Sequence, residues 1–187
     1  MNNFYTQEEL DKIELKSIGL NVKISRKVSI YSPQNIEIGD NVRIDDFCIL
    51  SGKIRIGNNI HIAAYSAIYG GNEGVYIDDF VNISSRVSIY SVSDDYSGLT
   101  MTSPVIPDEF KNVTSKKVSI CKHVIIGSTS VVLPGVTLNE GSAFGCFSLI
   151  KNDSLSWSIN TGIPSKKIKN RERNILQLEK EYLNKVK

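Results

Sequence analysis

The chain of 187 residues has room for one domain and a small appendage, because typical domains run to about 100–150 residues. Its 41% hydrophobic and 22% charged residues are typical of a soluble globular protein, and no apolar run approaches the ~20 residues that span a bilayer. A net charge of +2 is too small to indicate a nucleic-acid partner. We therefore expect a soluble protein that binds neither membrane nor nucleic acid.

The N-terminal segment and the cysteines both favour a cytoplasmic protein. Residues 1–16 lack the basic segment and the apolar stretch of a secretory signal. The cysteines are odd in number and widely spaced, which predicts neither a disulfide framework nor a zinc site: Cys48, Cys121 and Cys146. We expect reduced cysteines and no bound metal.

A short helix is predicted at the start of the chain. Thr6 and Glu9 have the spacing of a capping box, in which each side chain binds the other residue's backbone N–H. The apolar residues Leu10 and Ile13 follow on one side of such a helix. We assign residues 1–20 to a helical N-terminal cap.

A six-residue repeat follows and dominates the sequence. Every sixth residue is large and apolar in two runs: Ile38, Ile44, Leu50, Ile56, Ile62 and Ile68, then Ile120, Ile126, Val132, Leu138, Phe144 and Ile150. Twelve such places would all be apolar by chance with a probability on the order of 10⁻⁵ at this composition. The repeat is therefore a property of the fold.

A second column of smaller residues stands two positions before each of these anchors, for example Val42, Cys48 and Ser130. Residues i and i−2 of a strand share a face, so both columns point inward. Gly, Asp, Asn or Ser follows many anchors and supplies the turn. Six residues therefore make one short strand and one corner. We predict a parallel β-solenoid with three strands per coil and coils ~4.8 Å apart.

The repeat is interrupted by a polar, proline-containing loop at residues 90–117. Long insertions in compact domains are usually functional or disordered. Near the C-terminus, apolar residues recur at helical spacing: Ile175, Leu178, Tyr182 and Val186. We assign residues 21–160 to the β-helix with its inserted loop and 161–187 to a basic segment and helix. Helices at both ends are expected to cover the open coil edges.

The repeat, the loop and the segment TGIPSKKIK resemble the hexapeptide-repeat acyltransferases, in particular their galactoside and maltose O-acetyltransferase branch. That branch includes sugar acetyltransferases of lipopolysaccharide O-antigen synthesis. The segments HIAAYSAIYGG and SVSDDYSG are similar to acetyltransferases that act on dTDP-4-amino-4,6-dideoxyglucose. The resemblance implies an all-β, left-handed parallel β-helix and a homotrimer. It also implies acetyl-CoA in the groove between subunits and a loop that reaches the next subunit.

The same resemblance locates the chemistry. In galactoside-type enzymes a catalytic histidine follows the strand before the long loop, and laying that strand on VSIYSVSDD puts Asp94 in its place. The two histidines lie elsewhere, with His61 pointing outward from a coil and His123 at a corner. Asp94 and His61 are the candidate catalytic residues. In an ordinary polar loop, Asp94 and Asp95 would form turns or face solvent.

The missing histidine bears on the acceptor. A hydroxyl needs a general base with a pKa near 7, which is worth ~10²–10⁴-fold, and aspartate at ~3.9 is weak for that task. An uncharged amine needs positioning and a group that receives its proton. We therefore predict N-acetylation of a nucleotide-linked amino sugar. Candidate substrate contacts project outward before the loop or lie in it: Tyr65, Tyr69, Asn82, Arg86 and Asp95.

The resemblance also assigns cofactor contacts. Small corner residues occupy places that bind the pantetheine arm, and basic residues match positions that meet the nucleotide and its phosphates: Ser128, Cys146, Lys151, Lys166 and Lys169. A solvated basic tail would show the same lysines. Two alternative functions stay open: O-acetylation of a sugar hydroxyl, and a scaffold without catalysis. A solenoid carbonic anhydrase is excluded, since its metal needs three histidines.

Overall fold

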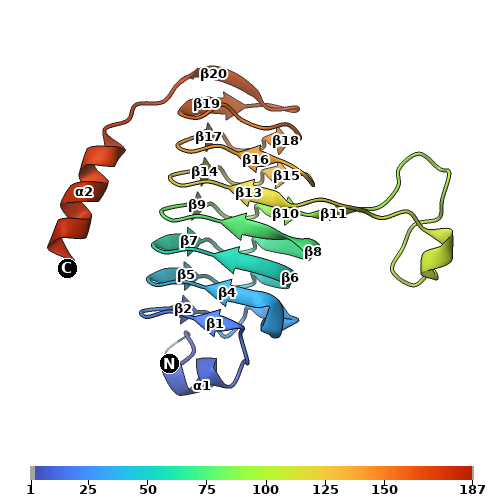
Figure 1. Cartoon of the computed structure of the whole chain (residues 1–187), viewed down its shortest axis with the longest axis horizontal. Helices are drawn as coiled ribbons and strands as arrows, with labels where there is room; N and C mark the ends of the chain where they lie inside the picture. Colours follow the sequence, from blue (N-terminus) through green and yellow to red (C-terminus); the bar gives the residue numbers. More distant parts are fainter. Residues whose placement is uncertain (1–2, 187) are drawn as a thin grey trace.

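The computed structural model describes residues 3–186 as a parallel β-helix with a helix near each end (Figure 1). Each coil contributes one strand to each of three faces. The first face contains β1 (Ser17–Ile18), β4 (Ile36–Ile38), the C-terminal halves of β6 (Ile49–Ile56) and β8 (Ala67–Ile77), β13 (Val118–Ile120) and β16 (Thr137–Leu138).

The other two faces are built in the same way. The second face contains β2 (Lys23–Ile24), β5 (Val42–Ile44), β7 (Ile60–Ile62), β9 (Asn82–Ile83), β14 (Ile125–Ile126), β17 (Ala143–Phe144) and β19 (Ser158–Thr161). The third face contains β3 (Ser29–Tyr31), the N-terminal halves of β6 and β8, β10 (Ser88–Tyr90), β15 (Val131–Val132) and β18 (Leu149–Ile150). Short 3-10 helices occupy Pro33–Asn35 (η1) and Asp108–Phe110 (η2).

The core lies along the axis of the coils and confirms the repeat. All twelve six-residue anchors are buried, and none is more than 4% exposed. The second column is buried with them, including Cys48 and Ser130 at 0% exposure. The residue between the two columns points outward, as strand geometry requires. The predicted parallel β-helix is therefore confirmed, and its outward positions are the ones available for function.

The N-terminal helix α1 (Gln7–Asp11) begins with the predicted capping box. The Glu9 backbone N–H donates to Thr6 Oγ1 at 3.4 Å, and the Thr6 N–H donates to Glu9 Oε2 at 2.8 Å. Leu10 is buried against the first coil. Two orphan donors of a short helix are satisfied by this exchange.

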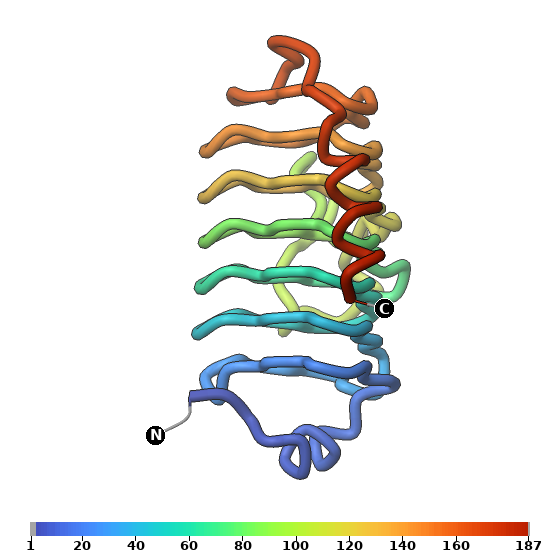
Figure 2. The backbone as a smooth tube through the Cα atoms, turned by 90° about the vertical axis from the view of Figure 1, so that its left-hand side faces the viewer, coloured from blue at the N-terminus to red at the C-terminus, as the bar shows by residue number. Residues whose placement is uncertain are grey.

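The C-terminal helix α2 (Ile175–Lys185) is confirmed, but the expectation that it covers the last coil edge is wrong. β20 (Lys166–Asn170) pairs antiparallel with β19 and occupies that edge. Because this pairing satisfies the edge, α2 turns back along the second face, where Tyr182 Oη donates to Asn59 Oδ1 at 3.0 Å (Figures 1 and 2). No helix of residues 3–186 has the length and apolar character needed to cross a bilayer.

Candidate active site

Two edges of the third face hold three of the candidate site residues, Asp94, Ser128 and Cys146. We call the edge between the second and third faces the serine corner; it carries Ser84, Ser128 and Cys146 in successive coils. We call the edge between the third and first faces the loop edge, because the chain leaves the body there after β10. The strand β10 separates the two edges within one subunit.

The inserted loop stands on a short two-stranded stalk. Ser91 is buried, and its hydroxyl donates to the Gly70 carbonyl. β11 (Val92–Ser93) then pairs antiparallel with β12 (Thr114–Ser115), and the Lys116 N–H donates to Ser91 O at 2.8 Å. These bonds hold both ends of the loop at the loop edge, and the loop projects away from the body (Figure 1).

Asp94 lies at the tip of this stalk with its side chain exposed. Asp95 instead organises the turn that follows, because its carboxylate accepts from the Ser97 N–H at 2.8 Å and from Thr100 Oγ1 at 2.8 Å. These hydrogen bonds, led by the Ser97 backbone N–H, lower the pKa of Asp95. Of the two aspartates, Asp94 is the one that faces outward from the stalk.

The predicted pantetheine contacts lie together at the serine corner. The Ser85 and Ser128 hydroxyls are 3.4 Å apart, and the Phe147 N–H donates to Ser128 O at 3.0 Å, which stacks the coils. A Cβ on Gly127 would lie 2.6 Å from the Cys146 backbone nitrogen, so only glycine allows this approach. The corner thus presents backbone groups with few covering side chains, which fits an extended thioester cofactor.

The predicted phosphate contacts stand at the C-terminal end of the same solenoid. Lys151 is exposed directly after β18. On β20, Lys166 pairs with Thr161 and Lys169 pairs with Ile159, and both lysines are exposed. Their positions leave the ammonium groups available to an anion that extends beyond Cys146.

The predicted acceptor contacts divide between the faces. Tyr65 and Arg86 lie at the serine corner, with the Arg86 Cζ 5.4 Å from the Tyr65 ring centroid. Tyr69 lies on the third face, where it stacks on Tyr90 at 5.0 Å and where burial raises its pKa. Asn82 lies on the second face, opposite His61 in the β7–β9 pair. The structure therefore places Tyr65 and Arg86 on the same corner as Ser128 and Cys146, whereas Tyr69 lies on the third face and Asn82 on the second.

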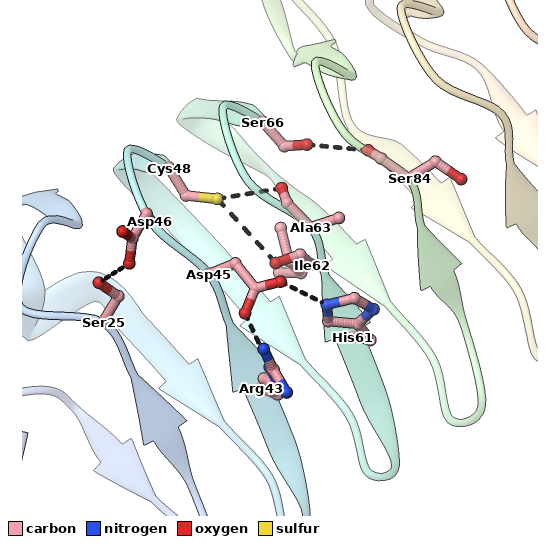
Figure 3. A network of polar contacts seen from close by, with 10 residues as sticks. All are labelled: Ser25, Arg43, Asp45, Asp46, Cys48, His61, Ile62, Ala63, Ser66 and Ser84. Atoms are coloured by element: carbon pink, nitrogen blue, oxygen red, sulfur yellow. Dashed lines mark hydrogen bonds and ion pairs between the residues drawn. The ribbon is translucent and has the colours of Figure 1, made fainter. Parts of the chain in front are cut away.

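His61 sits on the second face in a pair with Asp45. His61 Nε2 lies 2.8 Å from Asp45 Oδ2, and Arg43 Nε donates to Asp45 Oδ1 at 2.7 Å (Figure 3). Burial alone raises the pKa of Asp45, but the hydrogen bonds from His61 and Arg43 outweigh burial and lower it. Within one subunit the third face lies between His61 and Asp94, so these two candidate catalytic residues do not form one cluster.

His123 is buried under α2. Its Nε2 lies 2.7 Å from Glu179 Oε2, and its ring stacks on Phe80 at 5.3 Å. A cavity of about 410 Å³ beside it, between α2 and the second face, is also lined by His61 and Asn82. A second hollow of about 540 Å³ lies on the first face. Neither Asp94 nor Ser128 lines either of these two hollows.

The fold and this site define a class of enzyme. The chain matches the structure of a galactoside acetyltransferase in complex with coenzyme A with a TM-score of 0.57 and 21% identity, covering 91% of this chain and 75% of that one, a likeness of fold alone. No protein-family model matches the chain. The parallel β-helix fold is therefore shared with this acetyltransferase, and the acyltransferase class itself is shown by the relatives of higher identity described next.

Two further matches identify the family. The chain is 52% identical over 178 residues to a dTDP-4-amino-4,6-dideoxy-D-glucose acyltransferase of Escherichia coli, covering 91% of this chain and 92% of the relative. It is 53% identical to the N-acyltransferase AntD of Bacillus cereus, solved with dTDP and 3-hydroxybutyryl-CoA, with a TM-score of 0.97 and coverage of 100% and 99%. The chain belongs to the dTDP-4-amino-4,6-dideoxyglucose acyltransferase family.

Other structures of AntD carry a substitution at position 94 or position 84 of that protein. They include the D94A and D94N variants with dTDP and coenzyme A. They also include an S84A variant with dTDP-4-amino-4,6-dideoxyglucose and coenzyme A.

Proposed function

We propose that this enzyme transfers an acetyl group from acetyl-CoA to the 4-amino group of dTDP-4-amino-4,6-dideoxyglucose. The observation that carries the proposal is the 52% identity to an acyltransferase of that sugar over 91% of the chain. The AntD complexes support the same pair of ligand classes, a dTDP-linked amino sugar and a coenzyme A thioester. The absence of a histidine after β10 agrees with an amine acceptor.

We assign the chemistry to Asp94 and Ser84. This chain has aspartate and serine at the two numbers that the AntD variants change. Ser84 was not among our predicted site residues, because a serine directly after a strand is typical of a turn. Its backbone carbonyl, which accepts from Ser66 Oγ at 3.0 Å, has a second lone pair for a substrate N–H (Figure 3).

The proposed reaction needs an uncharged amine, a thioester and two hydrogen-bond acceptors that orient the amine. The uncharged amine attacks the thioester carbonyl, so that a C–N bond forms and the C–S bond breaks. Coenzyme A leaves as a thiolate, and it takes up the proton that the amine loses. The Asp94 carboxylate and the Ser84 carbonyl accept hydrogen bonds from the amine N–H groups, and they orient its lone pair toward the thioester. Hydrogen bonds to the amine strengthen as it becomes positively charged in the transition state.

We infer that the active enzyme is a homotrimer, because one subunit holds Asp94 and Ser84 at opposite edges of the third face. A neighbour's loop edge would bring its Asp94 to the serine corner. The outward positions of the third face are apolar over much of its length, including Ile49, Tyr69, Tyr90 and Val131. The loop also exposes apolar side chains, Leu99 at 88% and Val105 at 85%, which a neighbouring subunit would cover. Sedimentation at three times 20.8 kDa is expected.

We further place the reaction in the cytoplasm, in lipopolysaccharide O-antigen or capsule synthesis. Cys48, Cys121 and Cys146 are all free, which agrees with a reducing compartment. The product keeps its sugar–diphosphate bond, so a glycosyltransferase that builds surface polysaccharide is the class of enzyme that consumes it.

Thiol release from acetyl-CoA tests the proposal. We expect turnover with dTDP-4-amino-4,6-dideoxyglucose and none with the nucleotide sugar that carries a hydroxyl at the same carbon. Turnover with the hydroxyl sugar alone would establish O-acetylation, and failure to bind acetyl-CoA at millimolar concentration would favour a scaffold. A 3-hydroxybutyryl-CoA arm tests the choice of acyl group.

Variants of the loop test the role of Asp94. We expect Asp94→Asn to lower kcat/KM at least about tenfold, the lower part of the range for positioned proton-transfer groups. Glu109→Gln is the matched control, because Glu109 lies in the same loop, is exposed and has no ion pair within 4.0 Å among residues 3–186. Equal activity of the two variants would remove Asp94 from the mechanism. His61→Ala is expected to retain activity, because Asp45 holds His61 on the second face.

A further inference from the structure

The two ends of the β-helix differ in how they are covered. At the N-terminal end, α1 packs Leu10 against the first coil. At the C-terminal end, β20 is the last strand of the second face and pairs with β19 alone. Residues 162–165 lie across the third face in the same layer, where the Ser165 N–H donates to Leu149 O at 2.8 Å. Because α2 runs along the second face, nothing in residues 3–186 covers this terminal layer (Figures 1 and 2).

Exposed apolar side chains surround the terminal layer. Leu155 is 63% exposed, Ile163 is 73% exposed and Ile168 is 61% exposed. Leu155 lies on the side of the first face, since the N–H of the preceding Ser154 donates to Thr137 O at 3.1 Å. Ile163 lies on the side of the third face and Ile168 on β20. Single exposed apolar residues are common, but here each side of one layer presents one.

Lysines accompany these apolar residues. Lys166, Lys167 and Lys169 are exposed on β20, and none has a carboxylate within 4.0 Å among residues 3–186. Lys167 pairs with the buried Asn160, so its side chain lies on the inner side of the sheet, beyond the last coil. Lys166 and Lys169 pair with outward residues, on the side of the proposed phosphate contacts. We call the remaining set the open end: Leu155, Ile163, Lys167 and Ile168.

The charge of the chain is unevenly distributed along the solenoid. Residues 151–173 contain six lysines and arginines but two carboxylates, whereas residues 3–16 at the other end contain two lysines and four carboxylates. Lysines on an edge strand also hinder pairing with other chains, but exposed isoleucines beside them would oppose that protection. A surface that combines cations with aliphatic side chains is complementary to anionic lipid, which binds lysine at its headgroups and accepts apolar groups below them.

We propose that the open end docks on the anionic cytoplasmic face of a membrane, with Lys167 at the lipid phosphates and Ile163 and Ile168 in the interfacial layer. In the proposed homotrimer, solenoids packed side by side about a threefold axis present three open ends on one side, so that weak contacts add. Such docking needs no spanning segment, and it revises our expectation that the chain binds no membrane. Nucleic acid fits this surface less well, because the one aromatic residue of residues 151–173, Trp157, is buried and cannot stack on a base.

Co-sedimentation of the full chain with lipid vesicles tests this proposal. We expect binding to phosphatidylcholine vesicles that contain about 30% phosphatidylglycerol, little binding to pure phosphatidylcholine, and release in about 0.5 M salt. The double variant Lys167→Gln, Ile168→Thr removes one charge and one apolar side chain from each subunit. One lysine near an anionic surface changes partitioning about fivefold, so the variant trimer should bind about 100-fold more weakly.

A matched double variant controls for net charge. Leu20→Thr with Lys23→Gln removes the same two groups near the opposite end, where Leu20 is 74% exposed and Lys23 is exposed. We expect this control to bind vesicles within about twofold of the wild type, and both variants to keep the thermal midpoint of the wild type. Equal losses in the two variants would mean that net charge alone drives binding, and would overturn the open end as a docking surface.

Two further outcomes separate this proposal from its alternatives. Binding of duplex DNA that the Lys167→Gln, Ile168→Thr variant loses, without binding to anionic vesicles, would replace the membrane by a nucleic acid. Acetyl transfer to the free nucleotide sugar needs no vesicles. A wild-type enzyme that acetylates the sugar but does not bind vesicles would therefore overturn the docking alone, and one that binds vesicles without turnover would overturn the proposed function alone.

Discussion

Glu179 holds α2 against the β-helix, and its removal is expected to release the helix. Its carboxylate pairs with two side chains of the second face: His123 Nε2 lies 2.7 Å from Oε2, and Lys122 Nζ lies 2.6 Å from Oε1. The His123 side chain is 1% exposed and the Lys122 side chain is 34% exposed. In the Glu179→Ala variant, His123 loses its carboxylate partner in a buried position.

The two contacts differ in magnitude. A hydrogen bond to a charged group at a buried position contributes about 1.5–3 kcal/mol to stability. The free-energy cost of leaving its buried partner unsatisfied lies in the same range. The Lys122 ion pair is partly screened by solvent and adds less than about 1 kcal/mol. We expect the docking of α2 to weaken by about 2–3 kcal/mol, which corresponds to roughly a 30- to 150-fold larger population of the undocked helix.

Amide hydrogen exchange of α2 measures this population directly. An isolated helix of this length is marginal in water, so its protection depends on docking. Exchange of the α2 amides should accelerate by the stated factor, while exchange of β14 and β17 amides should not change. Glu181→Ala makes the same substitution on the exposed side of the helix and should leave protection unchanged. Equal protection in Glu179→Ala and the wild type would refute this account.

Three other perturbations have expected outcomes. Burial raises the pKa of Glu179, but the hydrogen bonds from Lys122 and His123 outweigh burial and lower it. The contribution of Glu179 to the docking of α2 is therefore complete above pH 4.5 and is lost as the pH falls below that value. Faster exchange of the α2 amides in acid measures this loss. Ile68→Ala should lower the free energy of unfolding in urea by about 2–5 kcal/mol, whereas Leu20→Ala, at a site 74% exposed, should change it by less than about 0.5 kcal/mol. Gly127→Ala should lower the thermal midpoint and the affinity for coenzyme A together, because its Cβ would press on the Cys146 backbone.

Under the proposed function, the serine corner accounts for acyl transfer by a chain with only two histidines. Neither His61 nor His123 lies at that corner: the first is paired with Asp45, and the second is buried beneath α2. What the corner offers is backbone carbonyls, such as that of Ser84, and the small residues Ser128 and Cys146. These groups suit the positioning of an amine, whose lone pair needs no base before it attacks.

The sequence alone determined the β-helix. The inward columns repeat every six residues, so each coil carries its own fold signal, and every anchor from Ile38 to Ile150 is buried as predicted. The capping box of α1 and the helical spacing of α2 were also readable, because both depend on residues within a few positions of one another. The family could also be identified from short sequence segments.

Only the tertiary structure decided how distant segments meet. The loop was visible as a break in the repeat, but only the stacked coils show that it leaves the body at the edge opposite Ser84. This separation is the basis of the proposed trimer. Similarly, α2 could not be placed from its sequence, because Glu179 meets His123 across 56 positions and β20 occupies the edge that α2 was expected to cover. Local periodicity specifies which way a side chain points. How the loop and α2 attach to the coils depends on contacts between residues far apart in the sequence, and these contacts form only when the coils have stacked.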